Sequence, residues 1–136
     1  MPAAEILVAS ASDLAPAHAE LAESFQKLTG HRVRFVTGSS GMLAQQISSG
    51  APYDLFLSAG RGFVEDLVKS GDVRADSMRL YAHGRLGLWS LSGKVRTIGD
   101  LLSADLRHVA IANPKVAPYG AAAKDLLVRE RLWDRV

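Results

Sequence analysis

Short apolar runs alternate with helix-periodic segments along the chain as far as residue 71. The strand-like runs are EILVAS (residues 5–10), HRVRFVTG (31–38), which alternates polar and apolar residues, and YDLFLSA (53–59). The helix-periodic segments are residues 13–28, 42–49 and 62–71. This alternation predicts an α/β fold with a parallel-rich sheet and helices on both faces. Ligands bind such sheets beyond the carboxyl ends of the strands, so the residues that follow each apolar run are the first candidates for a site.

Glycines mark the ends of the predicted helices. The first helical segment places four apolar residues on one face and ends at Gly30, and the next two segments end at Gly50 and Gly71. The four apolar residues are Leu14, Leu21, Phe25 and Leu28.

The second half of the chain departs from this alternation. Residues 79–90 (RLYAHGRLGLWS) form a longer apolar-alternating run with two glycines, which predicts a strand that leaves a first lobe. Residues 97–100 (TIGD) resemble a capping box before a short helix at residues 100–103. Residues 108–114 predict a buried strand and residues 119–133 a strong helix. We therefore expect a first lobe at 1–80, a hinge or crossing strand at 81–92 and a partial second lobe at 93–136.

Composition and charge argue against several classes of protein. The 136 residues are 48% hydrophobic and 22% charged, as in a folded globular domain, and no run approaches the roughly 18 apolar residues of a membrane span. A net charge of +2, with acids and bases intermixed, provides no basic stripe for nucleic acid. The chain has no cysteine, and its four histidines are scattered at residues 18, 31, 83 and 108, so we expect no bound metal cation and no cofactor. The two tryptophans, Trp89 and Trp133, lie in apolar patterns that predict core or hinge packing.

Small hydroxyl residues gather where the predicted strands meet the predicted helices. They are Ser10, Ser12, Ser39, Ser40 and Ser58. The first N–H groups of a helix lack intrahelical partners and carry partial positive charge, so hydroxyls beside them favour an anion site. The turns themselves contain no Lys or Arg, which suits an anion that must be released. Serine is also a favoured helix N-cap, and that simpler interpretation applies to each serine taken alone.

Several motifs, in order, resemble the periplasmic molybdate-binding proteins of ABC importers. They are SDL (residues 12–14), GSSG (38–41), QQISSGAPYDLFLSA (45–59) and NPKVAPYG (113–120). The resemblance implies a periplasmic-binding-protein-like fold with a first lobe and an incomplete second lobe, since family members continue well past residue 136. It also implies a periplasmic protein, without its signal peptide in residues 1–136, that passes molybdate or the near-isosteric tungstate to membrane permease subunits. The ligand would be bound as an oxyanion, and no reaction is implied.

The family's ligand-binding positions fall on residues of this chain. The resemblance implies that the hydroxyls of Ser12 and Ser40 and the backbone N–H of Tyr119 bind the oxyanion, and we expect support from the remaining serines at the same junctions. These are Ser10, Ser39 and Ser58. The chain departs from the family at Gly60, where an aspartate is common, so any contact made by that acid is missing.

Two alternatives from other classes remain at this point. One is a serine-dependent α/β enzyme, which would need a base beside Ser12 or Ser40. The other is a truncated, non-binding module that pairs through an incomplete second lobe, as an interaction partner or a swapped dimer.

Overall fold

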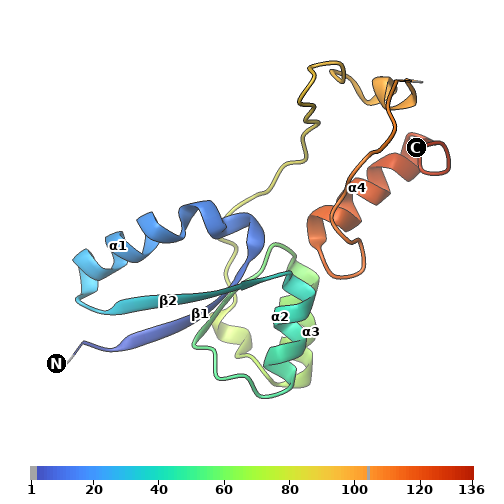
Figure 1. Ribbon diagram of the computed structural model, residues 1–136. Helices are drawn as coiled ribbons and strands as arrows, with labels where there is room; N and C mark the ends of the chain where they lie inside the picture. Colours follow the sequence, from blue (N-terminus) through green and yellow to red (C-terminus); the bar gives the residue numbers. More distant parts are fainter. Residues whose placement is uncertain (1–2, 104) are drawn as a thin grey trace. The chain divides into compact units, whose positions relative to one another are not determined.

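The computed structural model describes residues 3–103 and 105–136, and the chain forms two compact units, Met1–Leu80 and Tyr81–Val136 (Figure 1). No helix in these residues has the length and apolar character to cross a membrane.

The first unit is built on a three-stranded parallel sheet. The strands are β1 (Glu5–Ala11), β2 (Arg32–Gly38) and β3 (Leu55–Leu57), in the order β2-β1-β3. The central strand β1 has a neighbour on each side, and its residues from Val8 to Ala11 are buried. A strand covered on both faces reads as a continuous apolar run, which is the pattern seen in the sequence.

Helices cover both faces of this sheet, as predicted. The helices are α1 (His18–Thr29), α2 (Ser40–Ser48) and α3 (Arg61–Ser70), with short 3₁₀ helices η1 (Ser12–Ala17) and η2 (Ala75–Ser77). The connection from β1 to β2 and the connection from β2 to β3 run in opposite directions across the sheet, so right-handed crossovers place α1 on one face and α2 on the other (Figure 1). Helix α3 packs beside α2.

The predicted apolar face of α1 is only partly covered. Leu14 and Phe25 are half-buried, but Leu21 is 45% exposed and Leu28 is 85% exposed. The helix ends at Gly30, and α3 ends at Gly71, both in the left-handed conformation expected of a helix C-terminus. Both predicted ends are confirmed.

The second unit contains the 3₁₀ helix η3 (Ile98–Leu102) and the helix α4 (Pro118–Arg129). Its small core joins Leu101, Leu127 and Leu132, with Trp133 packed against it. The predicted capping box is present between Thr97 and Asp100, although the helix begins at Ile98 and not at Asp100. The packing predicted for Trp133 is confirmed, whereas Trp89 is 82% exposed, so its predicted packing is wrong.

The strands predicted at residues 79–90 and 108–114 are wrong. Both segments are irregular and largely exposed, and the described residues of the second unit contain no strand. An extended apolar segment becomes a strand only when a neighbour accepts and donates its backbone hydrogen bonds. Neither segment has such a neighbour in the described part of the chain.

Helix α4 also ends earlier than the predicted residue 133. Arg131 adopts φ 56°, the N–H of Leu132 donates to Leu127 O at 2.8 Å, and the N–H of Arg131 donates to Val128 O at 3.0 Å. These two bonds form a Schellman motif, in which a hydrophobic contact commonly accompanies the helix end. Here the contact joins Leu127 to Leu132 in the core, so burial of Leu132 favours ending the helix.

Candidate functional site

The strand register brings three serine-bearing turns to one edge of the sheet. Ala11 pairs with Gly38, and Ser10 pairs with Leu57. The residues that follow these positions begin the turns after β1, β2 and β3 at nearly the same level. Ser12, Ser39, Ser40 and Ser58 therefore lie at the carboxyl ends of neighbouring parallel strands, the edge at which such sheets bind ligands.

Ser40 is 1% exposed and links two of these turns. Its Oγ accepts a hydrogen bond of 3.0 Å from the N–H of Ala59, so the start of α2 is tied to the turn after β3. A serine hydroxyl that accepts one bond still has a proton to donate. The Ala59 amide is a site feature that the sequence reasoning missed, because a backbone donor leaves no side-chain signature. Its position directly after the FLS run was the only available signal.

Ser39 is the N-cap of α2. Its Oγ accepts a bond of 3.3 Å from the N–H of Met42. The capping interpretation therefore describes Ser39, whereas Ser40 points into the buried junction between turns.

Ser58 organises the turn after β3. Its hydroxyl donates to Gly60 O at 2.8 Å and accepts from the Gly60 N–H at 3.2 Å. Gly60 is the N-cap of α3 and has no side chain to cap it. The nearest cation in sequence, Arg61, forms an ion pair of 2.7 Å with Glu65. The hydrogen-bond donors of the turn itself are therefore neutral hydroxyl and amide groups.

Ser12 differs from the other serines because it is exposed. It is the first residue of η1, and within the described residues its side chain makes no hydrogen bond. An exposed hydroxyl without a protein partner can donate to a bound anion at little cost.

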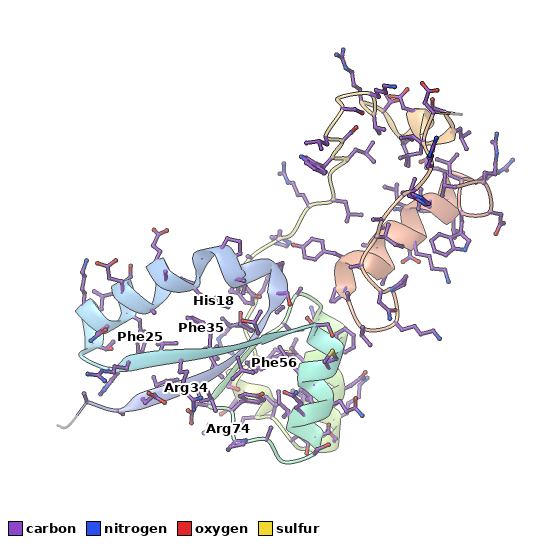
Figure 2. The ribbon with its side chains drawn as sticks, viewed as in Figure 1. His18, Phe25, Arg34, Phe35, Phe56 and Arg74 are labelled. Atoms are coloured by element: carbon purple, nitrogen blue, oxygen red, sulfur yellow. The ribbon has the colours of Figure 1, made fainter. Side chains whose placement is uncertain are left out.

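Ser10 faces inward. It is fully buried, and its Oγ lies 2.8 Å from His18 Nε2. The His18 ring stacks on Phe35, with ring centroids 3.9 Å apart and planes at 4° (Figure 2). The enzyme alternative needed a base beside Ser12 or Ser40, whereas the histidine here lies beside Ser10. No group of three or more metal-binding side chains occurs among the described residues.

Tyr119 belongs to the second unit, in the first turn of α4 after Pro118. Its N–H is one of the amides that a helix leaves without an intrahelical acceptor. The backbone of Gly84 packs against its ring, since a Cβ on Gly84 would lie 2.1 Å from the Tyr119 Oη. A glycine in residues 81–92 thus fits the tyrosine ring where the sequence had suggested a strand.

An open cavity of about 460 Å³ lies elsewhere in the second unit, on α4. It is lined by Leu86, Ala122, Asp125, Leu126, Val128 and Arg129. None of the predicted anion donors lines it, and its two charged lining residues, Asp125 and Arg129, have opposite charges, so the strand-end turns remain the better candidate for an anion site.

The family model for bacterial extracellular solute-binding proteins matches residues 6–136. The chain belongs to this family. The chain is 41% identical to the molybdate-binding protein ModA of Rhodobacter capsulatus, over 98% of this chain and 54% of that protein. It is 42% identical to ModA of Azotobacter vinelandii, over 93% of this chain and 51% of that protein. The chain spans about half the length of the curated relatives it matches.

A solved structure agrees with this family membership. The periplasmic molybdate-binding protein of Azotobacter vinelandii superposes with a TM-score of 0.88 at 39% identity, covering 95% of this chain and 57% of that one. The periplasmic-binding-protein-like fold expected from the sequence is therefore confirmed. The family and the two relatives are described as binding proteins, which agrees with the expectation of a protein that is not an enzyme.

Proposed function

We propose that this chain binds molybdate, or the near-isosteric tungstate, as a periplasmic solute-binding protein that delivers the oxyanion to the permease subunits of an ABC importer. The observation that carries the proposal is the meeting of neutral donors at one edge of a parallel sheet, with Ser12 exposed and Ser40 joined to Ala59. Similarity at 41–42% identity to two molybdate-binding proteins supports molybdate as the ligand.

The proposed donors are the hydroxyls of Ser12 and Ser40 and the N–H of Tyr119, with Ser39 and Ser58 holding the turns. In this proposal residues 1–80 form the first lobe, 81–92 the hinge and 93–136 part of the second lobe. Hydroxyl and amide donors bind a dianion by charge-assisted hydrogen bonds. They add no fixed positive charge, which allows release to a transporter.

Calorimetric titration of the protein with molybdate, tungstate, sulfate and phosphate in parallel tests this function. We expect molybdate and tungstate to bind more tightly than sulfate, because the two relatives at 41–42% identity are molybdate-binding proteins. Absence of binding to all four anions, or a preference for sulfate or phosphate, would refute the proposal.

A second candidate rests on the exposed apolar side chains of residues 80–91. Leu80 is 74% exposed, Trp89 82% and Leu91 89%. Exposed apolar side chains gathered in one segment are typical of surfaces that bind another chain. A module that associates through this segment would sediment as a dimer, and substitution of Trp89 and Leu91 by Ser would restore the monomer. A wild-type protein that sediments as a monomer at all concentrations removes this candidate.

A further inference from the structure

The contact between Ser10 and His18 closes the turn that carries Ser12. Ser10 is the penultimate residue of β1, and His18 is the first residue of α1. The bond of 2.8 Å between Ser10 Oγ and His18 Nε2 therefore spans all of η1. Ser10 is fully buried and His18 is half-buried, so the bond lies at least partly away from water.

The turn has few anchors of its own. None of the six residues of η1 is buried, and its N-cap, Ala11, provides no side-chain hydrogen bond. Segments with little burial and few protected hydrogen bonds are the parts of a protein that open most easily. The conformation of residues 12–17 is therefore held mainly by its two ends.

His18 fixes one of those ends to two strands. Its nitrogen contacts Ser10 of β1, while its ring lies flat on Phe35 of β2. Phe35 itself pairs in register with Val8 of the buried central strand. Stacking restricts rotation of the imidazole, so Nε2 stays directed toward the serine hydroxyl.

We infer that His18 is a positioning residue for the oxyanion site, which holds the η1 turn so that the Ser12 hydroxyl is presented to the anion. This inference rests on the proposed function. His18 does not contact the anion, and it acts through the geometry of Ser12. The role is independent of charge on the imidazole, because the ring nitrogen can accept from or donate to the serine hydroxyl.

Two substitutions separate the hydrogen bond from the stack. His18→Phe keeps an aromatic ring on Phe35 and removes the polar contact, while His18→Gln keeps a polar group near the position of Nε2. The matched control is His31→Phe, because His31 also makes one hydrogen bond, from the Ala4 N–H, but at the amino end of β2. Circular dichroism and the exchange protection of β2 and α2 confirm that each variant is folded.

Hydrogen exchange without ligand is the first measurement. We expect His18→Phe to increase the exchange of residues 12–17 about tenfold, the usual effect of losing one hydrogen bond that is partly buried. We expect His18→Gln to recover most of the protection, and His31→Phe to leave this segment unchanged. Unchanged exchange in His18→Phe would overturn the inference, whether or not the protein binds molybdate.

Molybdate calorimetry, with Ser12→Ala as a second background, is the second measurement. We expect His18→Phe to weaken binding about tenfold in the wild-type background and to have little effect when Ser12 is already alanine. An equal loss in both backgrounds would mean that His18 acts on general stability, and would overturn the positioning role. If exchange changes as expected but the wild-type protein binds none of the oxyanions, the proposed function fails and the clamp on the turn remains.

Discussion

Substitution of Ser40 by alanine should separate anion binding from helix capping. The Ser40 side chain is 1% exposed, and its Oγ accepts one hydrogen bond of 3.0 Å from the Ala59 N–H. Its remaining proton is the one we propose for the anion. A hydrogen bond to a charged group contributes about 1.5–3 kcal/mol, so Ser40→Ala should weaken molybdate binding by about one to two orders of magnitude.

The same change should also lower stability. It leaves the Ala59 amide without its protein partner, which costs about 1–3 kcal/mol in a partly buried position. The matched control is Ser39→Ala, which removes the N-cap bond to Met42 and should cost about 1 kcal/mol of folding free energy with a smaller effect on affinity.

Calorimetry with molybdate and urea unfolding on the same preparations provide the two readouts. We expect Ser12→Ala to lose affinity as Ser40→Ala does, without the loss of stability, because Ser12 is exposed and unbonded within the described residues. Wild-type affinity in both Ser12→Ala and Ser40→Ala would refute the assignment of these hydroxyls as anion donors.

Two further predictions concern the second unit. Gly84→Ala places a Cβ 2.1 Å from the Tyr119 Oη, so it should change the near-ultraviolet dichroism and lower the melting temperature. The control Gly87→Ala, whose Cβ would have nothing within 4 Å, should do neither. Equal effects of the two substitutions would contradict the packing of Gly84 against Tyr119. The backbone N–H groups of Arg96 and then Thr97, together with the Thr97 side chain, lower the pKa of Asp100. The charged carboxylate is thus favoured in the folded state, so its stabilising effect is present above the unfolded pKa of about 3.9 and is lost as pH falls through the lower folded value. An NMR titration that places the Asp100 pKa at or above about 3.9 would contradict this.

The first unit could be predicted from the sequence because its signals are local and agree with one another. Strands β1 and β3 lie in short apolar runs, β2 alternates polar and apolar residues, and the left-handed Gly30 and Gly71 end helices where the periodicity stops. The length of β3 was less predictable. The Asp54 carboxylate accepts from the Leu7 N–H at 2.8 Å and so replaces a backbone partner at the start of the strand.

The second unit shows what local signals miss. Residues 79–90 and 108–114 have strand-like patterns, but pairing depends on a neighbouring segment and not on the pattern itself. Likewise, the apolar periodicity that continues through Leu132 suggested a longer α4, while the contact between Leu127 and Leu132 favours a Schellman end. In both cases tertiary contacts decide the outcome.

The candidate site was predictable in position but not in detail. Parallel topology and serine placement predicted that the serine-bearing turns meet at one edge of the sheet, and the strand register confirms that meeting, while binding at this edge stays a prediction. The sequence did not reveal that Ser39 caps α2 while Ser40 accepts a bond from the Ala59 N–H, because adjacent serines at a helix start look alike in sequence. The pairing of Ser10 with His18 was also hidden, since it crosses a strand, a turn and a helix and has no fixed period.

The strand order β2-β1-β3 has a consequence for the newly made chain. The central strand β1 is synthesised before β2 and β3. Both of its edges therefore lack hydrogen-bonding partners until the strands that begin at Arg32 and Leu55 have been made. At about 5–20 residues per second, synthesis from Ala11 to Leu57 takes roughly 2–9 s. Throughout that interval an apolar segment has an open edge for other chains, so the aggregation risk of this protein is set by the time needed to reach its third strand.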